Sequence, residues 1–262
     1  MDIWIADARS GLLLDGRVAD GRPCQALCGG FGRVYGAFGD RGSCFGKGEK
    51  LFDFSLPPGT NTLLAFGEHI CALSGESDCV WAMCPRDGTL RLSAPAGSYP
   101  RHACVSPCGR YMAVAGGGAG EVVLLDRELM CIGRHRVAGA AVDVCFLPRS
   151  MAVLCAVGEE RITARLMEIR GRGVMEEMDA CPQAPCCLLA LPGGRMLAGV
   201  HGQVRHLDVR GRTVGCTRCV YPSRMRMSRL GPVFSDGWRG GLYTLDGKKR
   251  GCAPEPEDFY IT

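Results

Sequence analysis

The 262-residue chain has no run of 18 apolar residues, so no segment is expected to cross a membrane as a helix. After Met1 and Asp2 the sequence becomes strand-like at once, without the basic region and apolar core of an export signal. No window of ten or more residues places its apolar side chains at helical spacing, and each of the 38 glycines would weaken a helix by about 1 kcal/mol. We therefore expect a cytoplasmic protein that is not built from helices.

The sequence also lacks the short motifs of common catalytic centres. It contains no H-E-x-x-H, no G-x-S-x-G and no phosphate-binding G-x-x-x-x-G-K-[ST], and its five histidines are scattered. The glycine-rich stretches at residues 116–120 and 237–241 are better explained as tight turns than as phosphate-binding loops. From these patterns we predict no catalytic residue, no metal and no cofactor.

Charge and aromatic content give little support for a nucleic-acid partner. The chain has 31 Lys and Arg against 27 Asp and Glu, a net charge of +4, and 7% aromatic residues. Few aromatic side chains accompany the C-terminal arginines to stack on bases, and a solvated edge of outer strands explains these arginines better. They include Arg205, Arg210, Arg212, Arg218, Arg224, Arg226 and Arg229.

Cysteine, by contrast, is abundant, with 17 residues in the chain. An odd number leaves at least one cysteine without a disulfide partner, and no export signal points to an oxidising compartment. Five cysteines stand where Val, Ala or Ser would fit a strand, and we interpret them as small buried hydrophobic side chains. These are Cys71, Cys104, Cys145, Cys155 and Cys187.

One cysteine pair leaves an alternative open. Cys216 and Cys219 form a C-x-x-C, which could provide half of a tetrahedral zinc site or a redox dithiol. A zinc site would need a second pair of ligands, for which Cys24 with Cys28, or Cys181 with Cys186, have loose spacing. We therefore favour structural cysteines here as well.

The sequence does contain a hairpin that recurs about every 40 residues. It is clearest at residues 101–126, where a Pro-x-Gly turn and a glycine-rich turn separate three short apolar runs. The turn proline returns at spacings of 41, 44 and 40 residues, in the series Pro107, Pro148, Pro192 and Pro232. Two upstream copies, near residues 26–38 and 63–73, keep the apolar runs without the proline. Such a period is typical of a β-propeller, whose blades are small antiparallel sheets.

Six copies of this hairpin predict a single all-β domain, a propeller of six four-stranded blades, with seven blades as the alternative. Residues 1–23 contain strand-like runs with no inner hairpin before them, and a Pro- and acid-rich loop follows the last copy. We expect the N-terminal strands to join the C-terminal blade, because closing the ring removes open sheet edges. The predicted blades span residues 24–60, 61–100, 101–139, 140–183, 184–223 and 224–262.

The turn S-P-C-G-R-Y-M-A-V-A at residues 106–115 resembles the S-P-D-G turn of the YncE-like bacterial propellers, also called YVTN or WD40-like. The preceding G-S-Y-P-R-H-A at 97–103 is similar to the segment before that turn in the family. As a pattern the resemblance extends over about residues 24–250, although Cys108 replaces the usual acidic turn residue and no Trp-Asp pair ends a strand. The resemblance implies a propeller and no single activity.

Propeller geometry also predicts where a ligand would bind. Inner strands line a central channel, and the loops that enter them share one face with the loops between second and third strands. His102 and Asp143 each interrupt an otherwise apolar approach to an inner strand, so we expect both to face the channel. The other candidate ligand-binding residues on this face are Arg226, Glu121, Glu159, His201, Trp238 and Asp78.

Loops that differ from blade to blade, with no catalytic motif, favour a non-enzymatic binding or scaffold module. One face of a monomer would recognise a protein, a peptide or a small ligand. The alternative is a propeller-type enzyme, such as a lactonase-like hydrolase, with a metal or an acid–base pair at the mouth of the channel.

Overall fold

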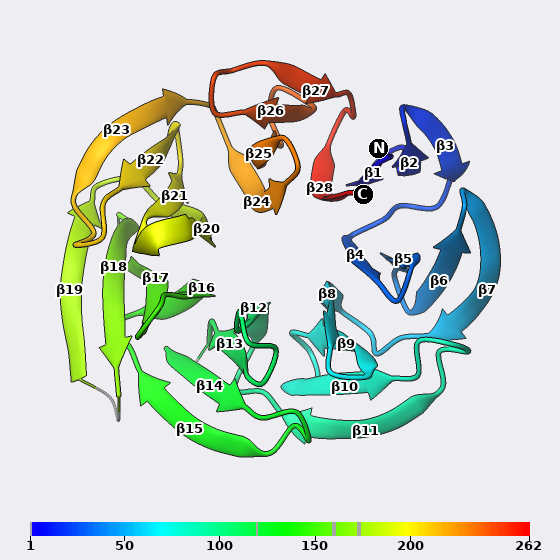
Figure 1. The fold of residues 1–262 in the computed structure, drawn as a ribbon, viewed down its shortest axis with the longest axis horizontal. Helices are drawn as coiled ribbons and strands as arrows, with labels where there is room; N and C mark the ends of the chain where they lie inside the picture. The colour runs from blue at the N-terminus through cyan, green and yellow to red at the C-terminus, as the bar shows by residue number, and fades with distance from the viewer. Residues whose placement is uncertain (1, 119, 159–160, 172–173) are drawn as a thin grey trace.

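The computed structural model describes residues 2–118, 120–158, 161–171 and 174–262, which form a ring of small sheets around a central axis (Figure 1). Seven four-stranded antiparallel sheets make up the ring, and we number them blades 1 to 7 along the chain. Within the described residues the only helical element is a short 3₁₀ turn, η1 at Pro192–Gly194. No helix in this part of the chain could span a bilayer. The chain is therefore an all-β, seven-bladed propeller.

The strands of the first four blades are short and follow one another along the chain, apart from the C-terminal strand, which belongs to blade 1. Blade 1 contains β1 (Ile3–Asp7), β2 (Gly11–Leu14), β3 (Arg17–Asp20) and β28 (Pro256–Ile261). Blade 2 contains β4 (Ala26–Gly30), β5 (Arg33–Phe38), β6 (Arg41–Gly46) and β7 (Glu49–Ser55). Blade 3 contains β8 (Thr60–Phe66), β9 (His69–Ser74), β10 (Cys79–Met83) and β11 (Leu90–Pro95). Blade 4 contains β12 (Pro100–Val105), β13 (Met112–Gly116), β14 (Glu121–Leu125) and β15 (Cys131–Arg136).

The remaining three blades have the same order of strands from the axis outward. Blade 5 contains β16 (Ala140–Phe146), β17 (Met151–Val157), β18 (Thr163–Arg170) and β19 (Val174–Cys181). Blade 6 contains β20 (Pro185–Ala190), β21 (Met196–Val200), β22 (Gln203–Leu207) and β23 (Thr213–Arg218). Blade 7 contains β24 (Pro222–Ser228), β25 (Gly231–Asp236), β26 (Leu242–Thr244) and β27 (Lys249–Gly251).

The ring closes through a pairing of the two chain ends, and this corrects the expected number of blades from six to seven. Strand β28 pairs antiparallel with β1, with Ile3 opposite Ile261 and Ile5 opposite Phe259. The N-terminal strands therefore do not join the sheet of blade 7, which already has four strands of its own. They form a separate blade, because the short apolar run after the Pro- and acid-rich loop supplies its inner strand.

Apolar side chains between neighbouring sheets hold the ring together. One cluster joins Phe66 and Leu73 of blade 3 to Met112 and Val114 of blade 4, and all four are buried. Each sheet inside such a ring has neighbours on both faces, which explains why the strands are runs of apolar residues rather than alternating patterns. Burying each of these side chains contributes roughly 1.5–3 kcal/mol.

Most inner strands carry a β-bulge near their start. The pairing register with the second strand shifts by one residue in β8, β12, β16, β20 and β24, and the pairing of β28 with β1 shifts in the same way. A bulge redirects the side chain that follows it. The residues immediately after the shifts are Thr62, His102, Asp143, Cys187, Arg224 and Asp258.

The loops that enter the inner strands lie beside the turns between second and third strands, as the sequence predicted. Backbone hydrogen bonds join the two kinds of segment in five blades. The pairs, donor first, are Ala8 with Glu255, Gly75 with Gly59, Gly117 with Tyr99, His201 with Ala184 and Gly237 with Tyr221. We call this surface the loop face, and the opposite surface, which carries the turns between first and second strands, the hairpin face.

Candidate functional site

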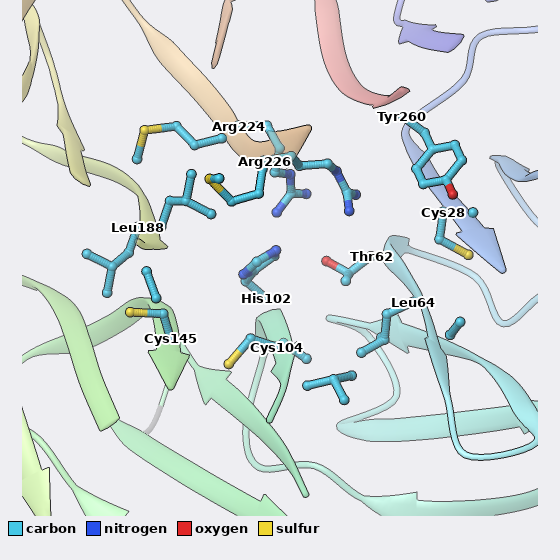
Figure 2. A pocket seen from close by; sticks show the side chains of 18 of the residues that line it. Cys28, Thr62, Leu64, His102, Cys104, Cys145, Leu188, Arg224, Arg226 and Tyr260 are labelled. Carbon is cyan, nitrogen blue, oxygen red and sulfur yellow. The ribbon is translucent and has the colours of Figure 1, made fainter. Parts of the chain in front are cut away.

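A cavity of about 440 Å³ lies along the axis of the propeller, between the inner strands (Figure 2). Its lining starts at Thr62, His102 and Arg224, near the beginnings of their strands, and continues to Pro107 and Ser228 beside the hairpin face. The site is therefore made by strands and extends toward the hairpin face, away from the loops on which most candidate residues were predicted.

One end of the cavity is organised by Asp143, which is buried in β16. Its Oδ1 accepts a 2.7 Å hydrogen bond from the backbone N–H of Val144 and also contacts Nδ1 of His102 in blade 4. Its Oδ2 accepts a 2.7 Å bond from the N–H of Leu188 in blade 6. The carboxylate thus connects three blades and fixes the ring of His102. His102 lines the cavity, whereas Asp143, which was also expected to face the channel, is buried and is not part of the lining.

Asp258 in β28 occupies the equivalent position on the other side of the channel. Its Oδ1 accepts a 2.8 Å bond from the N–H of Phe259, and its Oδ2 accepts a 3.1 Å bond from the N–H of Leu27 in blade 2. Nη2 of Arg226 in blade 7 donates to both carboxylate oxygens, at 2.9 and 2.8 Å. A second buried carboxylate therefore connects blades 7, 1 and 2.

The ionised state of Asp258 is favoured by its cationic neighbours. Burial alone would raise the pKa of this carboxyl, but the guanidinium groups of Arg226 and then Arg224 outweigh burial and hold the pKa below its ordinary value. The carboxylate is also saturated with donors, because the two backbone N–H groups and Arg226 occupy its lone pairs. Asp258 is thus suited to holding Arg226 and the strands in place rather than to moving protons.

Arg224 differs from Arg226 in having no hydrogen-bonded partner for its guanidinium among the residues that the structure describes. Its side chain is only 15% exposed, its Nε is buried without a hydrogen bond, and that Nε lies 3.7 Å from Oδ1 of Asp258. Leaving a buried guanidinium N–H such as this Nε unpaired is costly. Figure 2 shows the side chains of Arg224, Arg226 and His102 directed into the middle of the channel.

The rest of the cavity wall is mostly apolar. It is lined by aliphatic side chains such as Leu64 and Leu188 and by the thiols of Cys28, Cys104 and Cys145. Burial raises the pKa of all three thiols far above the neutral range, so they stay protonated and behave as apolar groups. The cavity therefore has one charged end and an apolar body.

Of the remaining predicted residues, those that the structure describes lie on the loop face and do not line the cavity. Asp78 accepts a 2.8 Å hydrogen bond from the N–H of Tyr99, and Glu121 forms an ion pair with Arg134 at 3.3 Å. His201 lies with its ring edge toward Tyr221, at 6.3 Å between centroids. Trp238 is 78% exposed. Glu159 lies outside the described residues.

Sequence reasoning missed Thr62, Arg224 and Asp258, which share the bulge position with His102 and Asp143. A signal for two of them was present. A proline two positions earlier precedes His102, Arg224 and Asp258 alike, as Pro100, Pro222 and Pro256. Alignment of the repeats on this proline would have selected them.

A zinc site at Cys216 and Cys219 would need further ligands, and the described residues place none beside them. Cys216 is exposed at the edge strand β23, and Cys219 is buried in the loop that follows. In this part of the chain no three side chains of His, Cys, Asp or Glu are grouped to hold a metal ion. All 17 cysteines are free thiols, and of the five strand positions Cys71, Cys145, Cys155 and Cys187 are buried as predicted, while Cys104 is partly exposed.

No protein-family model matches the chain, and no curated protein matches its sequence. Solved structures do match its fold. A Lactobacillus plantarum protein has a TM-score of 0.74 at 12% identity, with 99% of each chain covered. A Bacteroides fragilis protein provisionally assigned as a 6-phosphogluconolactonase has a TM-score of 0.73 at 11% identity, with 99% of this chain and 97% of that chain covered.

A third β-propeller structure also matches. The Cps50 (Swd1) β-propeller domain of Myceliophteria thermophila has a TM-score of 0.57 at 16% identity, with 69% of this chain and 64% of that chain covered. At such identities the similarities show the fold alone. The chain is thus similar to several kinds of β-propeller, and the narrower resemblance to the YncE-like family has no support from a family or sequence match.

Proposed function

We propose that this protein is a non-enzymatic binding module that takes a small ligand into the central channel. The proposal rests on one observation, the cavity in which Arg224, Arg226 and His102 converge above an apolar body. Its volume of about 440 Å³ lies within the range of small-molecule sites. A few polar groups at one end of an apolar pocket would fix the orientation of a ligand.

The chemistry of the lining supports binding rather than catalysis. Asp143 and Asp258 are occupied by backbone N–H groups and by their cationic partners, so neither is a free acid or base. The thiols of Cys104 and Cys145 have raised pKa values because they are buried, so they are poor nucleophiles at neutral pH. A reducing compartment such as the cytoplasm would keep these thiols free.

One observation favours an enzyme as the second candidate. Asp143 holds Nδ1 of His102, and Nε2 makes no hydrogen bond to any described residue, an arrangement that would suit a general base at the end of the cavity. The Bacteroides fragilis neighbour, assigned provisionally as a lactonase, agrees with a lactonase-like hydrolase. The resemblance to YncE-like propellers and to the Cps50 β-propeller domain agrees with the fold and favours neither role; a protein or peptide partner, if that is the ligand, would use the loop face.

Thermal unfolding of the purified protein against a panel of small metabolites tests the proposal. A channel ligand at a hundred times its Kd should stabilise the fold by about 2.7 kcal/mol, and His102→Gln should weaken that effect. Trp238→Ala on the loop face is the control and should leave it unchanged. Hydrolysis of a lactone by the wild type, lost in His102→Gln, would favour the enzyme. Stabilisation that depends on Trp238 and not on His102 would show that the ligand binds at the loop face and not in the channel.

A further inference from the structure

The charges at the end of the cavity near Arg224 and Arg226 are not evenly paired. Arg226 donates to Asp258 at 2.8 Å and also to the carbonyl oxygen of Leu27 at 2.9 Å, so this guanidinium has a fixed place in the wall. Arg224 contacts the same carboxylate only at 3.7 Å and makes no hydrogen bond through its guanidinium to the described residues. Arg224 is therefore the cation whose donors are left for a ligand.

The second carboxylate near Arg224 is Glu257, which lies beside Asp258 on β28 and is exposed. Its charge acts on Arg224, but the structure has no hydrogen bond between the two side chains. Glu257 would therefore repel an anion bound to Arg224 without blocking it. Removal of the Glu257 charge should therefore increase the affinity for an anion, whereas removal of the Arg224 charge should decrease it.

The apolar body of the cavity limits what kind of anion fits. Leu64, Val105 and Phe146 line it together with neutral thiols, so a fully hydrated inorganic ion would leave this surface in contact with water. An organic group would cover it, at a gain of about 25 cal/mol per Å² of apolar area. A guanidinium matches the two oxygens of a planar acid through parallel hydrogen bonds.

From these observations we propose that the channel binds a small organic anion, with its acid group on Arg224 and its apolar part along the inner strands. This inference depends on the proposed function of the same cavity and specifies the ligand class. A carboxylate and a phosphate monoester share the required chemistry, and the experiment below separates them.

Isothermal titration calorimetry at fixed ionic strength tests the inference with three probes of similar shape: benzoate, phenyl phosphate and neutral benzamide. We expect benzoate or phenyl phosphate to bind at least about tenfold more tightly than benzamide, because a charge-assisted bond to Arg224 is lost in the amide. Arg224→Gln should weaken binding of the acid at least about tenfold, and Glu257→Gln should strengthen it. Arg91→Gln, which removes an exposed arginine from the outer strand β11, is the matched control and should change nothing.

If Arg224→Gln lowers the melting temperature too far for titration, Arg224→Lys keeps the charge with fewer donors and should give intermediate affinity for the acid. Equal affinity for benzamide and benzoate, or acid binding unchanged in Arg224→Gln, would overturn the anion inference while leaving the channel as a binding site. Absence of binding by all three probes would also overturn it, and the metabolite panel would then decide on the proposed function separately.

Discussion

At the scale of single residues, two buried aspartates organise the channel in the same way. Asp143 and Asp258 each accept the N–H of the next residue and an N–H from the following blade, and each holds a cationic or ionisable side chain from the preceding blade. Hydrogen bonds to charged groups contribute about 1.5–3 kcal/mol each, so these carboxylates matter for the ring as well as for the ligand. They position His102 and Arg226 for the site.

Asp258→Asn should destabilise the protein by about 3–5 kcal/mol, because it removes the buried carboxylate that holds the half-buried Arg226 and leaves that guanidinium without its counter-charge. Chemical denaturation of the variant and the wild type measures this difference. Asp246→Asn, at an exposed turn, is the control and should have little effect. A loss below about 1 kcal/mol for Asp258→Asn would contradict a structural role for the pair.

The same variant makes a prediction about pH. Because the folded state lowers the pKa of Asp258 below 3.8, its contribution is complete above that value and is lost as the pH falls through the lower folded pKa. The stability gap between the wild type and Asp258→Asn should therefore be constant from neutral pH to about pH 4 and shrink in stronger acid. A difference in stability that increases in acid would contradict the lowered pKa of Asp258.

At the scale of elements, the sequence predicts the six local hairpins well and the seventh blade poorly. Each inner strand from β4 to β24 pairs with the next strand through a short turn, so proline and glycine mark the pair. The inner strand of blade 1 pairs with a strand more than 240 residues away, as Ile261 does with Ile3, and no turn joins them. A long-range pairing leaves no local pattern, which is why six blades were expected.

The residues of the site were likewise predictable from the sequence only in part. His102 and Asp143 stand out in the sequence as polar side chains in apolar inner strands, but only His102 lines the cavity, and Asp143 is buried. Arg224 has no pattern that sets it apart from the other C-terminal arginines, and Asp258 lies in β28, directly after Pro- and acid-rich residues that indicate a loop. The candidates on the loop face were chosen on the assumption that loops form the site, whereas the cavity follows the strands.

Closure by β28 predicts that Phe259 is among the most important core residues, because it is fully buried between blades 7 and 1. Phe259→Ala should lower the free energy of unfolding by about 3–5 kcal/mol. Trp238→Ala removes a larger aromatic group that is exposed and should change it by no more than about 0.5 kcal/mol. Similar effects of the two substitutions in urea denaturation would argue against this closure.

At the scale of the whole molecule, the seven blades converge on one axis and bring side chains from distant parts of the sequence into one cavity. Thr62, His102 and Arg224 come from blades 3, 4 and 7 and are 40 or more residues apart. Each blade contacts its neighbours through apolar clusters, so the inner strands are held rigidly around the cavity. We propose that this channel is the place where a ligand binds.

Nuclear magnetic resonance of the arginine Nε–Hε groups measures this claim most directly. Addition of benzoate should shift the Arg224 signal, assigned by its loss in Arg224→Gln, because the guanidinium that carries this Nε gains a hydrogen-bonded anion. Signals of exposed arginines such as Arg91 and Arg239 should stay in place. Shifts confined to arginines of the loop face, with Arg224 unmoved while benzoate binds, would contradict the account.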